Sequence, residues 1–143
     1  MQQAEEHVWY TDSKTISGIT GKAYPAYALE IFEQSAVVDD ILLMTDKEHV
    51  EYCKKEICEK YGIKKVSAVA PGGKERYESV WKALCILKER EQTGYVMIHD
   101  GARPFITEEV LKRIYGQVQD KKAVVLIGNV REKDAPLKSL FKE

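Results

Sequence analysis

The sequence lacks several features that would place it in a specialised class of protein. Its 22 basic and 23 acidic residues leave a formal charge of −1, so no overall field favours nucleic acid or an anionic membrane surface. Its apolar runs are far shorter than a membrane span, and its start lacks the basic segment and apolar core of a signal peptide. We therefore expect a soluble, cytoplasmic protein that binds neither nucleic acid nor a membrane.

Cysteine is scarce and has no pairing pattern. Cys53, Cys58 and Cys85 make an odd count, and none has the spacing of metal ligands. We expect no disulfide framework and no zinc site, only small, partly buried thiols in a reducing compartment. With 143 residues, of which 44% are hydrophobic, the chain is long enough to bury one core and predicts a single domain, 1–143.

Short apolar runs alternate with helix-period stretches from residue 37 onward. This alternation is typical of βαβ units and predicts an α/β fold with a mostly parallel sheet and right-handed crossovers. Continuous apolar runs are expected for strands that are covered on both faces. Four such runs predict strands at 41–44, 66–69, 95–98 and 123–127.

Three stretches between these runs predict helices. The first has an apolar stripe and a glycine stop, the second has an apolar face expected to pack on the sheet, and the third has Thr107 as its N-cap. Their marker residues are Val50, Cys53, Ile57, Tyr61 and Gly62 in the first, Val80, Ala83, Leu84 and Leu87 in the second, and Val110, Ile114 and Val118 in the third.

Two loops that follow predicted strands contain residues suited to chemistry. In open α/β sheets ligands bind at the carboxyl ends of the strands. After one strand, Gly72-Gly73 lets the backbone approach a planar or phosphorylated ligand, or simply connects strand to helix. After another, Asp100 can hold a divalent cation and Arg103 can reach phosphate, or the two can pair and cap a turn. His99 is more typical of a packed, hydrogen-bonded residue than of a catalyst.

These two loops carry a family resemblance. Gly-Gly-Lys-Glu-Arg-Tyr-Glu-Ser-Val at 72–80 and His-Asp-Gly-Ala-Arg-Pro-Phe at 99–105 closely resemble the paired signatures of the 2-C-methyl-D-erythritol 4-phosphate cytidylyltransferases. The similarity runs from about Gly21 to about Ile127. It implies a three-layer, Rossmann-like nucleotidyltransferase fold in a partial domain, with 26–127 family-like, 1–25 atypical and 128–143 an atypical tail.

The resemblance also implies roles for individual residues. Asp100 binds Mg²⁺ and holds the sugar phosphate, Arg103 positions the anionic end of that substrate, and Lys14 falls near the position of the family's catalytic lysine. The first motif lines the cytosine and ribose of CTP, with one arginine steadying the loop; its residues are Gly72, Gly73, Lys74, Arg76 and Ser79.

The implied reaction needs no protein nucleophile. A phosphate oxygen of methylerythritol phosphate attacks the α-phosphorus of CTP and pyrophosphate leaves, in non-mevalonate isoprenoid biosynthesis. One alternative is a ribitol 5-phosphate cytidylyltransferase, although Gly101-Ala102 favours the methylerythritol branch. Another alternative is a non-catalytic nucleotide-binding remnant. A homodimer is implied by the resemblance alone.

The sequence departs from the family at both ends. Met1–Ser13 contains no glycine, so the family's first strand and its glycine-rich AAGxGxRM loop are not readable, and loss of that strand would expose an apolar sheet edge. The family's Asp-Thr-Ile-Lys stretch is only poorly matched here, by Asp134-Ala135-Pro136-Leu137-Lys138. We therefore expect the chain to be weakly active or inactive.

A displaced reading frame is our hypothesis for the N-terminal departure. Reading the codons of Lys14–Pro25 one base later permits Lys-Gln-Phe-Leu-Glu-Leu-x-Gly-Lys-Pro-Ile, which is a typical segment of the family. The DNA sequence of the gene tests this hypothesis. We expect codons that encode the segment in the shifted frame, and codons that cannot encode it would end the idea.

Overall fold

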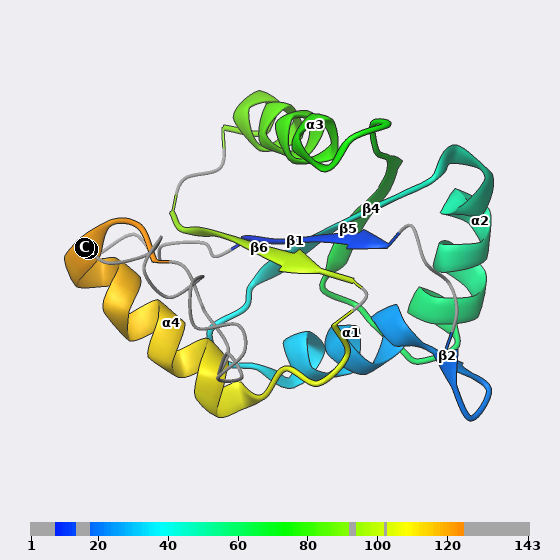
Figure 1. The fold of residues 1–143 in the computed structure, drawn as a ribbon, viewed down its shortest axis with the longest axis horizontal. Coiled ribbons are helices and arrows are strands. Elements are labelled where there is room, and N and C mark those ends of the chain that lie inside the picture. Colours follow the sequence, from blue (N-terminus) through cyan, green and yellow to red (C-terminus); the bar gives the residue numbers. More distant parts are fainter. Residues whose placement is uncertain (1–7, 14–17, 92–93, 102, 125–143) are drawn as a thin grey trace, which may run out of the picture.

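Four parallel strands form the centre of the structure (Figure 1). The computed structural model describes residues 8–13, 18–91, 94–101 and 103–124. The strand order across the sheet is β5-β4-β1-β6. These strands are β1 (Val8–Ser13), β4 (Asp40–Thr45), β5 (Val66–Pro71) and β6 (Val96–Asp100). A separate antiparallel pair consists of β2 (Gly18–Ile19) and β3 (Lys22–Ala23).

The central position of β1 corrects our expectation that the first strand is missing. β1 pairs with β4 from Val8↔Asp40 to Ser13↔Thr45, and with β6 from Val8↔Val96 to Asp12↔Asp100. The segment Val-Trp-Tyr-Thr is rich in β-branched and aromatic residues, which fit a pleated sheet without needing an alternating pattern. Periodicity alone therefore missed this strand.

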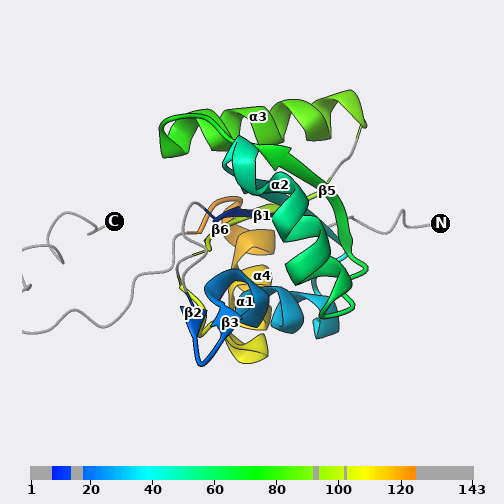
Figure 2. The same ribbon diagram turned by 90° about the vertical axis from the view of Figure 1, so that its right-hand side faces the viewer.

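Helices cover both faces of the sheet, so the fold has three layers (Figures 1 and 2). On one face lie α1 (Tyr24–Gln34), α4 (Glu108–Lys121) and the helix that links β4 to β5, whereas α3 (Arg76–Glu89) lies on the other. The linking helix has three successive parts: η1 (Lys47–His49), α2 (Val50–Tyr52) and the π-helical η2 (Cys53–Glu59). The predicted α/β fold with a parallel sheet and flanking helices is confirmed.

The helix signals in the sequence are largely confirmed. Cys53 and Ile57 are buried, and the chain turns away at Gly62, which has a φ of +65°. The Thr107 hydroxyl accepts a hydrogen bond from the Val110 N–H at 3.3 Å, so Thr107 is the N-cap of α4. Within the described residues, no helix is long and apolar enough to cross a membrane.

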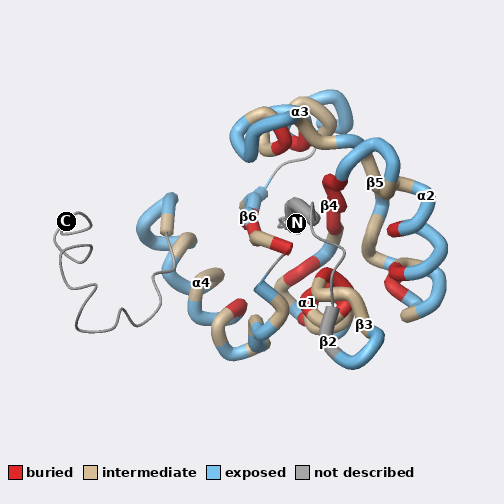
Figure 3. The backbone as a smooth tube through the Cα atoms, turned by 45° about the vertical axis from the view of Figure 1, so that its right-hand side comes forward, coloured by how far each residue is buried: buried red, intermediate tan, exposed pale blue. Residues whose placement is uncertain are grey.

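The core lies in two layers, one on each face of the sheet (Figure 3). The larger layer packs the sheet against α1, α4 and η2, and it includes Leu29, Phe32, Ile41, Leu43, Ile57 and Leu111. The smaller layer packs the sheet against α3 and comprises Leu42, Met44, Ala83 and Leu87. Residues 41–44 of β4 are buried throughout and contribute to both layers, as a continuous apolar run predicts for a strand covered on both faces.

Strand β6 and one flank of α3 are less covered than we expected. Val96 and Ile98 are 41% and 48% exposed, and Leu84 of α3 is 38% exposed. The reason is that α3 packs over β4 and β1 and leaves one face of β6, the outermost strand of the described sheet, open. Of the predicted strand at 123–127, only Ala123 and Val124 are described, and neither lies in a strand.

The cysteines match the expectation of buried thiols. Cys53 is buried, whereas Cys58 and Cys85 are partly buried, and all three are free. Burial, reinforced by Cys53 and Glu59, raises the pKa of Cys58 to about 11, so this thiol stays protonated near neutral pH.

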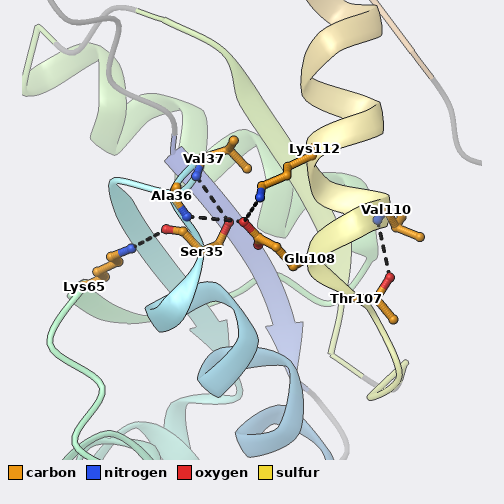
Figure 4. A network of polar contacts seen from close by, with 8 residues as sticks. All are labelled: Ser35, Ala36, Val37, Lys65, Thr107, Glu108, Val110 and Lys112. Carbon is orange, nitrogen blue, oxygen red and sulfur yellow. Dashed lines mark hydrogen bonds and ion pairs between the residues drawn. The ribbon is translucent and has the colours of Figure 1, made fainter.

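A polar network fastens the start of α4 to the end of α1 (Figure 4). The Ala36 N–H donates to Oε1 of Glu108 at 3.4 Å, and the same oxygen lies 3.7 Å from Nζ of Lys112. Nζ of Lys65 donates to the Ser35 carbonyl at 2.7 Å. Because α4 begins shortly after β6 ends, this attachment restrains the loop that follows Asp100.

Candidate active site

The carboxyl ends of all four parallel strands meet at one edge of the sheet. Asp12 is the register partner of both Met44 and Asp100, while Thr45 is the partner of Pro71. The turn after β5 and the turn after β6 therefore lie at the same edge. Three interstrand spacings separate β5 from β6, which corresponds to roughly 14 Å across the edge.

The diglycine turn packs directly against the first turn of α3. The Gly72 N–H donates to the Thr45 carbonyl at 2.8 Å, and the Gly73 N–H donates to Oγ of Ser79 at 2.9 Å. A Cβ on Gly73 would lie 2.2 Å from Cβ of Glu78, and one on Gly72 would lie 2.5 Å from Oγ of Ser79. The glycines are therefore required for close approach of the helix, and neither has a positive φ.

Two further side chains of α3 hold this turn. Oε2 of Glu78 accepts hydrogen bonds from the Lys74 N–H at 2.7 Å and the Glu75 N–H at 3.2 Å. Glu75 and Glu78 also form a reciprocal capping box at the start of α3. Nζ of Lys82 donates to the Gly72 carbonyl at 2.9 Å.

These bonds decide which kind of ligand the turn suits. All four N–H groups from Gly72 to Glu75 donate to protein oxygens, so they do not form a cradle for phosphate. Glu75 and Glu78 also place negative charge at the positive end of the α3 dipole, where an anion would otherwise bind. Of the two ligands left open by the sequence, the geometry favours a planar group over a phosphorylated one.

Asp100 and Arg103 lie at the other end of the edge. The Arg103 N–H donates to the Asp100 carbonyl at 3.0 Å and closes the turn, while Nε of Arg103 lies 3.8 Å from Oδ2 of Asp100. The Arg103 side chain is 82% exposed, so this ion pair contributes at most about 1 kcal/mol. Both groups are therefore accessible to a ligand at the strand end.

His99 is packed against α1, on the face of the sheet that carries the larger core layer. It is 8% exposed and contacts the ring of Phe32 edge to face, with a centroid distance of 5.2 Å. Burial lowers its pKa to about 4; Asp100 and a backbone bond at Arg103 raise it, while the charges of Arg103 and Arg76 lower it. His99 is therefore neutral at pH 7.

The remaining predicted positions are only partly described. Lys14 and Ala102 lie outside the described residues, although Ser13, which precedes Lys14, ends β1 at the same edge as Asp100. Arg76 and Lys74 are exposed, whereas Ser79 is fully buried and reaches the turn through the Gly73 N–H. Ser79 therefore supports the turn from beneath.

The donor set fits a magnesium ion bound mainly by its substrate. Among the described residues, no group of three or more His, Cys, Asp or Glu side chains gathers as a metal site. Asp100 supplies one partly exposed carboxylate at the strand end. Mg²⁺ commonly uses one or two carboxylates together with phosphate oxygens, so a single carboxylate fits a metal that arrives with a nucleotide.

Sequence reasoning missed the parts played by Glu78 and Lys82. Glu78 had a readable signal, because an acidic residue three positions after a potential cap, ahead of an apolar helix, resembles a capping box. Lys82 had none, since it lies among the polar residues on the outer side of the predicted helix. Its contact with the Gly72 carbonyl depends on where α3 packs.

The parallel sheet and its covering helices form a nucleotidyltransferase fold. Among solved structures, the chain is similar to 4-diphosphocytidyl-2C-methyl-D-erythritol synthase from Anaerococcus prevotii DSM 20548, with a TM-score of 0.71 at 20% identity, over 91% of this chain and 61% of that chain. It is also similar to a CMP:2-keto-3-deoxy-manno-octonic acid synthetase complexed with CTP, with a TM-score of 0.62 at 16% identity, over 83% and 49% of the two chains. At such identities the likeness shows the fold.

The sequence comparisons identify the family. A family model described as 2-C-methyl-D-erythritol 4-phosphate cytidylyltransferase matches residues 8–135. The enzyme of that name from Clostridium kluyveri (strain NBRC 12016) is 43% identical over 94 residues, which are 66% of this chain and 39% of the relative. That from Lachnospira eligens (strain ATCC 27750 / DSM 3376 / VPI C15-48 / C15-B4) is 39% identical over 114 residues, 80% and 48%. The chain belongs to this family and spans less than half the length of these two relatives.

The packing at the diglycine turn predicts opposite effects of two glycine substitutions. Gly73→Ala should destabilise the protein by about 1–3 kcal/mol, because the new methyl group collides with the backbone-attached Cβ of Glu78. Gly116→Ala in α4 has open space around it and should stabilise by about 0.5–1 kcal/mol. Urea unfolding measures both values, and equal effects of the two substitutions would contradict the packing described.

The buried His99 predicts a loss of stability in mild acid. The folded pKa of about 4 lies below the ordinary value of 6.5, so the unfolded chain binds more protons between these values. The contribution of the neutral His99 to the free energy of unfolding is complete above pH 6.5 and falls as the pH drops towards 4. The loss is about 2 kcal/mol between pH 7 and 5.

Unfolding free energies of His99→Phe measured at the two pH values test this effect. Phenylalanine has no proton to gain, so the variant should lose less stability in acid than the unsubstituted protein. The partly exposed His49 supplies the control, His49→Phe, which also removes an imidazole but leaves His99 and its acid response in place. An identical pH response of the His99 and His49 variants would disprove the assignment.

Proposed function

We propose that the chain is a cytidylyltransferase that transfers CMP from CTP to 2-C-methyl-D-erythritol 4-phosphate and releases pyrophosphate, in non-mevalonate isoprenoid biosynthesis. The observation that carries the proposal is that the diglycine turn and the Asp100 turn lie at one sheet edge in a chain of this family. The name of the relatives supports the reaction, and the separation of the two turns along the edge supports a site for each end of the nucleotide.

The diglycine turn takes the cytosine and ribose. Its N–H groups are bonded to protein oxygens, which suits a flat, uncharged base and disfavours a phosphate. Gly72, Gly73 and Lys74 form the contact surface, Ser79 holds it through the Gly73 N–H, and Arg76 steadies the start of α3.

The Asp100 end takes the charged groups. Asp100 holds Mg²⁺ and positions the sugar phosphate, the exposed guanidinium of Arg103 binds its anionic end, and Lys14 adds positive charge near the end of β1. When bound, Mg²⁺ neutralises charge on the phosphates. No side chain forms a covalent intermediate, so the residues act by holding the phosphate oxygen in line with the α-phosphorus and by offsetting negative charge.

A nucleotide-binding piece with little or no turnover is the second candidate. It is favoured by the absence of glycine from Met1–Ser13, where the family places the start of its triphosphate loop. Gly101-Ala102 continues to favour methylerythritol phosphate over ribitol 5-phosphate as the acceptor. Pairing of two copies and a cytoplasmic location complete the proposal, both on the basis of family membership alone.

Calorimetry with CTP and Mg²⁺ tests the proposed site. We expect Mg·CTP to bind below millimolar concentration, and Asp100→Asn to weaken that binding about tenfold, because the amide is a poor magnesium ligand. Asp120→Asn, on the exposed side of α4, is the matched control and should leave the affinity unchanged. No binding at millimolar Mg·CTP, or equal affinities for the two variants, would refute the site.

Pyrophosphate release separates the two candidates within the same experiment. Turnover that depends on Mg²⁺, CTP and methylerythritol phosphate would establish the transferase, and we expect its rate to be low. Binding without release of pyrophosphate would instead support the nucleotide-binding piece.

A further inference from the structure

One flank of α3 faces the diglycine turn with three polar side chains. Glu78, Ser79 and Lys82 are spaced at i, i+1 and i+4, and each bonds to the backbone of the turn. The contacts run in chain order along the turn: Lys82 holds the Gly72 carbonyl, Ser79 the Gly73 N–H, and Glu78 the next two N–H groups. Each peptide group from residue 72 to residue 75 is thereby fixed from the helix.

We propose that Glu78 and Lys82 are positioning residues that hold the diglycine turn in its nucleotide-binding shape. This inference rests on the proposed function and extends it to two side chains that would not themselves touch the base. The assignment comes from the geometry of their contacts, with donor–acceptor distances of 2.7 Å for Lys74 N–H to Glu78 and 2.9 Å for Lys82 to the Gly72 carbonyl.

The composition of the turn makes such fixing necessary. Two successive glycines have the greatest backbone freedom of any pair, so ordering them costs more conformational entropy than ordering other residues. Hydrogen bonds to a carboxylate or an ammonium group are stronger than neutral ones and restrict the orientation of each peptide plane. The helix therefore orders the turn before any ligand arrives, and the benefit appears as nucleotide affinity.

A substitution at Lys82 distinguishes a positioning role from a contribution to the cap of α3. Glu78 belongs to the capping box, so its loss also weakens the start of α3. Lys82 lies more than a turn further on, takes no part in the cap, and contacts the turn through the Gly72 carbonyl. A change at Lys82 should therefore alter the turn while leaving the helix and the global stability nearly unchanged.

The test compares Lys82→Met and Glu78→Ala with matched exposed controls on the same helix, Lys88→Met and Glu89→Ala, in the full chain. Amide-proton exchange at Gly73, Lys74 and Glu75 is measured without ligand, and the Kd of Mg·CTP is measured by calorimetry. We expect exchange at these amides to accelerate about tenfold in Glu78→Ala, and by a smaller factor in Lys82→Met, with no change in the controls.

The Kd should rise about tenfold in Glu78→Ala and about threefold in Lys82→Met, because a turn that is competent for a fraction of the time weakens binding by that fraction. Unchanged exchange at the turn in both variants overturns the positioning role, whether or not nucleotide binds. Faster exchange with an unchanged Kd overturns it too, since the contacts would then be structural only. If the unsubstituted chain binds no Mg·CTP, the proposed function fails, and the role of the turn in nucleotide binding fails with it. The exchange rates in the two variants then still show whether Glu78 and Lys82 hold the turn.

Discussion

Backbone pairing of β1 with strands on both sides is the interaction on which the rest of the structure depends. β4 and β5 lie on one side of β1 and β6 lies on the other, so in the described part of the chain β1 joins the two parts of the sheet. Its register with Thr45 and Asp100 brings the ends of β4 and β6 to one edge. Without that pairing, the sheet would not hold the diglycine turn and the Asp100 turn at a common edge.

The position of β1 also defines where a ligand can bind. The chain passes from β1 outward to β4 and β5, and then returns to the opposite side of β1 to form β6. At such a change of direction, the loops of neighbouring strands diverge and leave a crevice at their carboxyl ends.

The sequence predicted the elements whose signals are local. The buried run in β4, the Thr107 cap and the glycine stop at Gly62 each follow from a few neighbouring residues, and all three are present. β1 could not be predicted in this way, because Val-Trp-Tyr-Thr-Asp-Ser has neither a long apolar run nor an alternating pattern, and its pairing partners are distant in the sequence. The exposure of Val96 and Ile98 could not be predicted either, since an apolar run does not show which strand a helix will cover.

At the candidate site, residue types were predictable and their partners were not. The motif identified the two glycines as site residues. In the structure, glycine is required at both positions because Glu78 and Ser79 approach them closely, which depends on the angle at which α3 leaves the turn. The same approach engages the N–H groups of the turn, and so changes which part of a nucleotide it suits.

The groups at the two ends of this edge support the orientation proposed for the nucleotide. The diglycine end carries Glu75 and Glu78 together with Lys74, Arg76 and Lys82, so its side-chain charges are mixed. Its backbone N–H groups are already bonded to protein oxygens and leave no free backbone donors for a triphosphate. The other end carries the exposed guanidinium of Arg103 and the carboxylate of Asp100, which together suit a metal-bound phosphate. The separation of β5 from β6, roughly 14 Å, is comparable to an extended nucleoside triphosphate. The proposed orientation, with the base over the diglycine turn and the phosphates beside Asp100 and Arg103, follows from this difference in available donors.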